Sequence, residues 1–151
     1  MIGARKPSTI LMADDDPDDC MLAEDALREA RVLNTLRTVE DGEELMEYLC
    51  HTGRYAEPAS APRPGLILLD LNMPRKDGRE ALREIKGDLT LRRIPIIVLT
   101  TSRADEDILR TYDLGVNSFC TKPVTFDGLV RLMQTMACYW FEIVELPSGR
   151  E

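Results

Sequence analysis

The chain alternates short aliphatic runs with longer segments in which apolar residues recur every three or four positions. Runs of the first kind predict buried strands, and segments of the second kind predict amphipathic helices. We expect strands at residues 8–13, 36–40, 66–70, 95–100 and 118–121, and helices at 17–30, 43–50, 78–87, 105–114 and 127–145. This alternation predicts an α/β fold in which helices cover both faces of a parallel five-stranded sheet.

The first helix has clear signals for its start and for its buried face. Asp16 is expected to be its N-cap, with Pro17 at the first helical position. The residues expected to face the core are spaced as in a helix rather than a strand: Met21, Leu22, Leu27 and Cys20.

The length of 151 residues predicts a single domain. We divide the chain into an N-terminal extension at residues 1–8, a domain at 9–146 that ends in an extended C-terminal helix, and a tail at 147–151. The proline-rich segment 52–64 is expected to form a surface loop.

Charge and composition exclude several classes of function. The net charge of −8 opposes binding to nucleic acid. No apolar stretch approaches the roughly 20 residues that a membrane span needs, and the N-terminus lacks the apolar core of a signal peptide. We therefore expect no membrane association and a cytoplasmic location. The cysteines show no close pairing, so they are expected to be reduced rather than to form disulfides or a zinc site.

A polar residue lies at the end of four of the expected strands. These residues are Asp14, Asp15 and Asp16 after the first strand, Asp70 after the third, Thr100 at the end of the fourth, and Lys122 after the fifth. Parallel strands end at one edge of their sheet, where open α/β sheets place their ligand sites. We therefore expect these groups to converge on one small volume.

Each of these residue types has a chemical role at such a site. Three neighbouring aspartates repel one another, and a bound Mg²⁺ would relieve that repulsion, although Asp16 alone is explained as a helix cap. An aspartate such as Asp70 can attack phosphorus and form an acyl phosphate. A threonine hydroxyl can donate a hydrogen bond to a phosphoryl oxygen, and the compact charge of a lysine suits phosphate.

With these residues in this order, the chain resembles the receiver domains of two-component response regulators. The resemblance covers about residues 9–144. Its motifs are the acidic residues after the first strand, Asp70-Leu71-Asn72-Met73-Pro74 with Asp77-Gly78 downstream, Thr100, and Lys122-Pro123. It implies a doubly wound, flavodoxin-like sheet with the strand order 2-1-3-4-5.

The resemblance implies a phosphoacceptor and a metal site. Asp70 would accept a phosphoryl group from a phosphohistidine of a sensor histidine kinase, which makes the protein a phosphoacceptor switch rather than an enzyme. Mg²⁺, or Mn²⁺ in its place, would be bound by Asp15, Asp70 and the backbone carbonyl of Asn72. Asp14 would assist through water.

The resemblance also assigns roles on the other side of the site. Thr100 would hydrogen-bond the phosphoryl group, and Lys122 would pair with it. Phe119 occupies the aromatic switch position and would act together with Thr100. The Lys122–Pro123 bond is expected to be cis, which would aim the lysine at the phosphoryl group.

Within this family the chain looks most like the single-domain regulators that partner phytochrome-type kinases. The finer match rests on four segments: Leu99-Thr100-Thr101-Ser102, Gly115-Val116-Asn117-Ser118, Thr121-Lys122-Pro123 and residues 139–147. Apolar residues surround the axis of the last helix, so we expect part of it to form a homodimer interface. The expected interface residues are Tyr139, Trp140, Phe141, Ile143 and Val144. Alternatively, the tail after Leu146 covers this surface.

Two other classes of function fit these residues less well. An aspartate-nucleophile phosphatase of the haloacid dehalogenase type is disfavoured, because Asn72 stands where those enzymes carry a general acid. A phosphate-independent interaction module would be expected to lose an acidic, threonine or lysine position, and none is lost. No output domain follows in the sequence, so the signal is expected to leave either by protein–protein contact or by transfer to a further phosphotransfer protein.

Overall fold

The structure, a computed structural model, describes residues 8–101 and 105–143, without the side chains of residues 105–107, 109 and 141–143. Apart from Ser8, the predicted N-terminal extension and the predicted tail therefore lie outside the described residues.

Five parallel strands form one sheet in the order β2-β1-β3-β4-β5, which confirms the predicted fold class. The strands are β1 (Thr9–Ala13), β2 (Leu36–Val39), β3 (Pro64–Leu69), β4 (Ile96–Thr100) and β5 (Ser118–Thr121). The helices are α1 (Pro17–Glu29), α2 (Gly42–Cys50), α3 (Gly78–Gly87), α4 (Asp105–Asp113) and α5 (Phe126–Ala137). The π-helical segment η4 (Cys138–Ile143) continues α5, and 3₁₀ turns lie at Gly53–Tyr55, Pro58–Ser60 and Leu91–Arg93.

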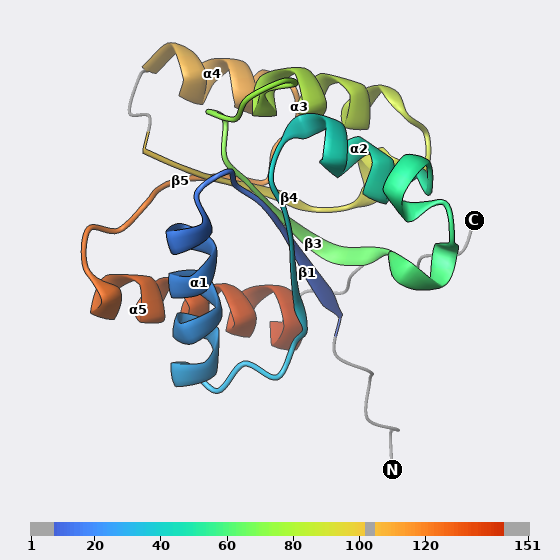
Figure 1. The fold of residues 1–151 in the computed structure, drawn as a ribbon. Helices are drawn as coiled ribbons and strands as arrows, with labels where there is room; N and C mark the ends of the chain where they lie inside the picture. Colours follow the sequence, from blue (N-terminus) through green and yellow to red (C-terminus); the bar gives the residue numbers. More distant parts are fainter. Residues whose placement is uncertain (1–7, 102–104, 144–151) are drawn as a thin grey trace.

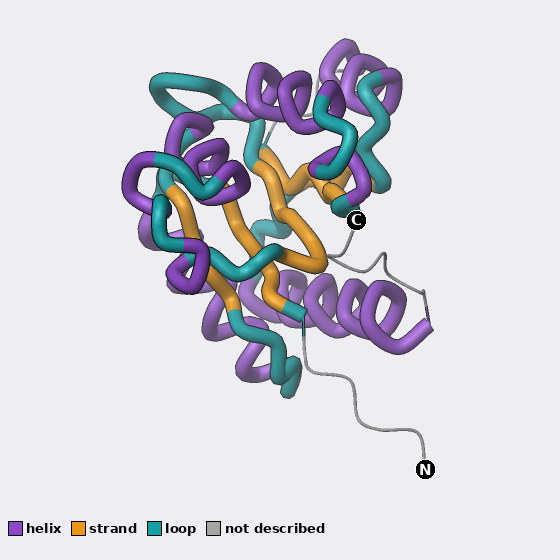
Figure 2. The backbone as a smooth tube through the Cα atoms, turned by 90° about the vertical axis from the view of Figure 1, so that its right-hand side faces the viewer, coloured by secondary structure: helices purple, strands orange, loops and turns teal. Residues whose placement is uncertain are grey.

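Helices cover both faces of the sheet. Figure 1 shows α1 and α5 on one face and α2, α3 and α4 on the other, and Figure 2 shows the strands between these two layers. None of the helices that the structure describes is long and apolar enough to cross a membrane.

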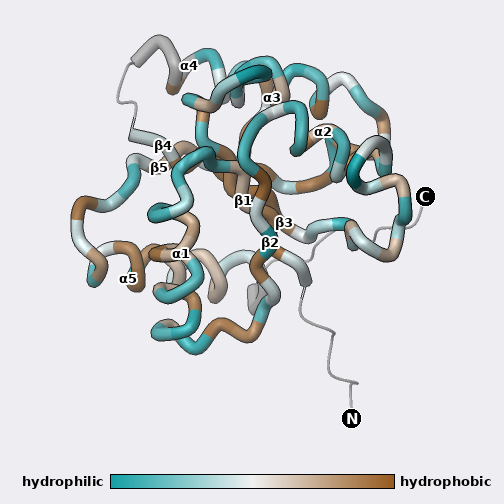
Figure 3. The backbone as a smooth tube through the Cα atoms, viewed as in Figure 1, coloured by the Kyte–Doolittle hydropathy of each residue, from teal (hydrophilic) through white to brown (hydrophobic). Residues whose placement is uncertain are grey.

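Successive strand residues point into two separate cores, as the pleat of a β-strand requires. Figure 3 shows hydrophobic residues along the strands in the middle of the molecule and also on parts of the helices and loops around them. The core under α1 and α5 contains Ile10, Met12, Leu66 and Leu68, and the core under α2 and α3 contains Leu11, Ala13, Ile67 and Leu69. Strands that are aliphatic on both faces are typical of a sheet covered on both sides.

The buried face of α1 differs from the prediction. Ala23, Ala26 and Leu27 are buried, whereas Met21 and Leu22 are 59% and 45% exposed. The small side chains of Ala23 and Ala26 let α1 approach the sheet closely. The orientation of the helix that buries these alanines leaves Met21 and Leu22 exposed. The prediction of a core-facing position was right for Leu27 and wrong for Met21 and Leu22.

The last helix begins one residue earlier than predicted, because Thr125 caps it. The Thr125 hydroxyl accepts a hydrogen bond from the backbone N–H of Gly128 at 3.0 Å. The α-helix ends at Ala137 and continues as η4, so the long helix predicted for residues 127–145 is not one regular α-helix. Residues 144 and 145 lie outside the described part.

The loop between β3 and α3 packs directly against the end of β3. The backbone N–H of Gly78 donates to the carbonyl of Leu71 at 3.0 Å. A Cβ at Gly78 would collide with the carbonyl oxygen of Asp70 and lie 2.7 Å from the Cα of Leu71. The absence of a side chain at Gly78 therefore lets α3 start against Asp70 and Leu71, directly after the end of β3.

We expect Gly78→Ala to lower the free energy of unfolding by about 1–3 kcal/mol, because the added methyl group must displace backbone atoms. The matched control is Gly87→Ala at the other end of α3, where an added Cβ meets nothing within 4 Å. That variant should leave stability unchanged or raise it by up to about 1 kcal/mol. Urea unfolding measures both effects, and equal effects would contradict the packing argument.

Candidate functional site

Polar side chains converge at the carboxyl edge of the sheet. The parallel register of β1, β3, β4 and β5 places the ends of these strands side by side. Asp14, Asp70, Thr100 and Lys122 lie there in direct hydrogen-bond contact. The structure thus brings together the side chains that the sequence placed at four strand ends.

Asp70 lies at the centre of this cluster and is only 6% exposed. One carboxylate oxygen, Oδ1, accepts hydrogen bonds from the Thr100 hydroxyl at 2.8 Å and from the backbone N–H of Asn72 at 3.1 Å. The other, Oδ2, lies 3.0 Å from the ammonium nitrogen of Lys122. Donors therefore fix both oxygens of a carboxylate that can act as a nucleophile.

The ammonium group of Lys122 is shared by three carboxylates. Its Nζ lies 2.6 Å from Oδ2 of Asp14, 2.7 Å from Oδ2 of Asp19 and 3.0 Å from Oδ2 of Asp70. Burial alone would lower the pKa of Lys122, but the hydrogen bonds to these carboxylates raise it above its usual value. The lysine is therefore held as a cation beside the nucleophile.

The sequence interpretation missed Asp19. It identified the acidic residues before the helix but not the acidic residue within its first turn, which faces the same site. The signal that could have found it is position: a helix that starts directly after Asp14–Asp16 carries the side chains of its first turn back over the strand end.

The other acidic residues of this segment differ in burial and role. Asp14 is 1% exposed, and burial raises its pKa, although Lys122 and the backbone N–H of Asp16 act in the opposite direction. Asp15 is exposed. Asp16 accepts a hydrogen bond from the backbone N–H of Asp18 at 2.9 Å, so it caps α1 as predicted.

The carboxylates fit a hard divalent cation. Oxygens of Asp14, Asp15 and Asp70 lie within 4.8 Å of one another. Mg²⁺ takes oxygen ligands and is usually bound through one or two carboxylates while it keeps several waters. Asn72 lies beside this group, since its backbone N–H contacts Asp70. Its carbonyl as a ligand stays a prediction.

Comparison with known proteins identifies the family. The pattern of the response regulator receiver domain matches residues 10–134, which is most of the chain. The chain belongs to this family. It is a receiver domain, a phosphoacceptor switch of two-component signalling.

The receiver is similar to regulators that cover nearly all of its length. Response regulator Rcp1 of Synechocystis sp. is 40% identical over 143 residues, 95% of each chain. The structure of the phosphorylated cyanobacterial phytochrome response regulator RcpA has a TM-score of 0.87 and 43% identity, covering 95% of this chain and 100% of that one. The Mn²⁺-bound form of Rcp1 has a TM-score of 0.84 and 40% identity, covering 94% and 100%.

The predicted cis bond before Pro123 is wrong. The described part of the receiver contains no cis peptide bond, so the Lys122–Pro123 bond is trans. The trans form is the lower-energy state of most such bonds, and from it the lysine side chain already reaches Asp70. Phe119 is partly buried and packs on the core under α2 and α3, and its switching role stays a prediction.

One residue of the predicted dimer interface, Trp140, is buried inside the domain. Trp140 is only 9% exposed and packs in the core under α1 and α5, so it was wrongly assigned to the receiver's outer surface. Tyr139 is 52% exposed and lies edge-on against this indole, with ring centroids 5.2 Å apart. The side chains of Phe141 and Ile143, and all of Val144, lie outside the described part.

We expect Asp15→Asn to weaken Mg²⁺ binding by about tenfold or more, because it removes a charge from the group of three carboxylates. Asp16→Asn is the matched control: its amide oxygen can still cap α1, and Asp16 is not part of that group. A Mg²⁺ titration followed by NMR chemical shifts compares the two variants. A stronger effect of Asp16→Asn would indicate that Asp16, rather than Asp15, binds the metal.

Proposed function

We propose that Asp70 of this receiver accepts a phosphoryl group from a phosphohistidine of a sensor histidine kinase. The observation that carries the proposal is the hydrogen-bonded arrangement of Asp70, Thr100 and Lys122 beside the group of three carboxylates. It combines a nucleophile, a hydroxyl donor and a fixed cation in one buried site.

In the proposed reaction, a carboxylate oxygen of Asp70 attacks phosphorus. A phosphorus–oxygen bond forms, the phosphorus–nitrogen bond of the phosphohistidine breaks, and the imidazole nitrogen keeps the electron pair. In this structure Thr100 and Lys122 donate hydrogen bonds to the Asp70 carboxylate. After transfer they would donate to oxygens of the phosphoryl group instead. Mg²⁺ or Mn²⁺ would neutralise phosphoryl charge when bound by Asp15, Asp70 and the carbonyl of Asn72, with Asp14 assisting through water.

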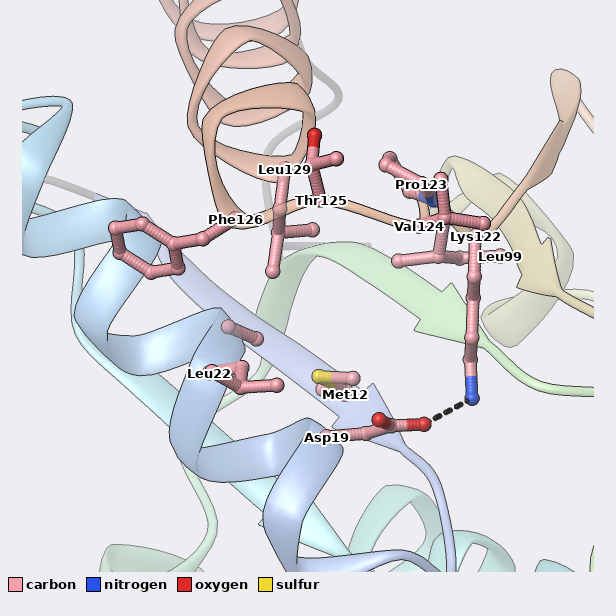
Figure 4. A pocket seen from close by; sticks show the side chains of 11 residues that line it. Met12, Asp19, Leu22, Leu99, Lys122, Pro123, Val124, Thr125, Phe126 and Leu129 are labelled. Carbon is pink, nitrogen blue, oxygen red and sulfur yellow. Dashed lines mark hydrogen bonds and ion pairs between the residues drawn. The ribbon is translucent and has the colours of Figure 1, made fainter.

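A groove beside the site supports docking of a helix that carries the donor histidine. It has a volume of about 160 Å³ and lies between α1 and the start of α5, with Lys122 at one side (Figure 4). Leu22, Val124 and Phe126 line it and are 45%, 92% and 40% exposed. An amphipathic helix can lay its apolar face into such a groove. This role would explain why Leu22 faces outward.

We propose a kinase of the phytochrome type as the partner, in the cytoplasm. The similarity to RcpA, a phytochrome response regulator, supports the kinase class. The cysteines, all unpaired, support a reducing compartment. The phosphoryl signal would leave either by protein contact or by transfer to a further phosphotransfer protein.

We expect one phosphoryl group on the receiver after incubation with acetyl phosphate and Mg²⁺, because this donor has a good leaving group and needs no docking partner. Intact-mass spectrometry should show the label on the wild type and none on Asp70→Asn. Omitting Mg²⁺ should suppress it. Undiminished labelling of Asp70→Asn would refute the assignment of the phosphoacceptor.

We also propose a homodimer through the C-terminal region, supported by the exposed Tyr139 at the start of the apolar segment that follows α5. Light scattering over a range of concentrations should show the dimer. Tyr139→Glu should weaken it without unfolding the protein, because this side chain lies outside the core. A wild type that stays monomeric at high micromolar concentration would rule the dimer out.

A further inference from the structure

Lys122 reaches the phosphoacceptor under constraint from two sides. An ammonium group has three N–H donors, and the three carboxylates of Asp14, Asp19 and Asp70 occupy all of them. Asp14 and Asp70 follow strands of the sheet, whereas Asp19 belongs to α1. Figure 4 shows the lysine side chain extending toward α1, where it meets Asp19.

The Asp19 carboxylate is held by a well-fixed piece of backbone. It lies in the first turn of α1, which Asp16 caps and in which Pro17 takes the first position. Its side chain is 34% exposed, so it can be changed without opening the core. The function derived above gives this contact no role.

We propose that Asp19 is a positioning residue for phosphoryl transfer. Together with Asp14 it holds two N–H groups of Lys122, which directs the third toward Asp70 and an arriving phosphoryl oxygen. When the phosphoryl group is attached, the bonds to Asp14 and Asp19 stay, and only the third moves from Asp70 Oδ2 to a phosphoryl oxygen. This inference rests on the proposed function and adds to it the residue that orients the lysine.

The physical reason is the flexibility of lysine. Its side chain loses more rotamer freedom on ordering than most others, so a lysine with one fixed partner would sample many positions. A second fixed partner restricts that sampling before the donor arrives. Misplacing a reacting or stabilising group by about 1 Å is enough to slow a reaction markedly.

The test compares rates of labelling by acetyl phosphate at saturating Mg²⁺. Asp19→Ala should be about fivefold slower than the wild type, as expected for loss of one partly exposed charge-assisted hydrogen bond. Asp19→Asn should keep most of the rate, because its amide oxygen can still accept from Lys122. The control is Asp18→Ala, which removes an acidic residue from the same turn.

A double-mutant cycle separates positioning from a general structural effect. In a Lys122→Met background, Asp19→Ala should cause no further loss, since Asp19 acts only through the lysine. A wild-type rate in Asp19→Ala, an equal loss from Asp18→Ala, or the same loss in the Lys122→Met background would each overturn the inference.

A readout without phosphoryl transfer distinguishes failure of this inference from failure of the proposed function. The Lys122 ammonium should give a protected signal in ¹H–¹⁵N NMR spectra that weakens in Asp19→Ala but not in Asp18→Ala. An unlabelled wild type that still shows this pattern would refute the phosphoacceptor role alone. A labelled wild type with the same ammonium signal in Asp19→Ala would refute the positioning role alone.

Discussion

One ammonium group joins three strand ends and helix α1 at the carboxyl edge of this sheet. Lys122 follows β5, yet its Nζ contacts a carboxylate after β1, another after β3 and a third in α1. Asp14 and Asp70 are almost wholly buried, and burying a charge is costly unless it is paired and hydrogen-bonded. The ion pairs with Lys122 meet that condition. They also hold the ends of β1, β3 and β5 close together.

The loop that follows Asp70 is held against the start of α2 by a backbone hydrogen bond and an ion pair. The N–H of Gly42 donates to the carbonyl of Lys76 at 2.8 Å, and a side chain at Gly42 would collide with that carbonyl. Arg75, at a φ of 62°, pairs with Asp41 at 2.5 Å. Burial would raise the pKa of Asp41, but the backbone N–H of Glu44 and the guanidinium outweigh it and lower the pKa. The start of α2 thus fixes the loop that follows Asp70.

The alternation of strands and helices and the strand-end residues could be predicted because each depends on short-range pattern. The strand order 2-1-3-4-5 was instead implied by the resemblance to receiver domains. A buried parallel strand is aliphatic on both faces, so the first polar residue after it marks the carboxyl edge. Which side of α1 faces the sheet could not be predicted, because it depends on how closely Ala23 and Ala26 let the helix approach its neighbours. The same holds for Trp140, whose burial depends on its fit against α5 and the sheet rather than on its own apolarity.

The contact between Asp19 and Lys122 shows a different limit. The two residues are 103 positions apart, and the local sequence around either one does not predict that it contacts the other. Only the strand order, with β1 and β5 ending at one edge, brings them within hydrogen-bond reach. A site of this kind can be located from sequence, but which of its residues pair with one another is set by the three-dimensional fold.

The same geometry bears on the kind of phosphoryl donor that the receiver can use. All three N–H groups of Lys122 are taken up by carboxylates, and the residue two positions after Asp70 is Asn72, whose side chain has no acidic proton to give a leaving group. A donor therefore needs a leaving group that departs with little help from a general acid. Phosphohistidine and acyl phosphates meet this requirement, whereas phosphate esters of alcohols do not. In the described part of the site, the Thr100 hydroxyl, the backbone N–H of Asn72 and the Lys122 ammonium surround Asp70 with donors that stabilise charge, as a phosphoacceptor needs.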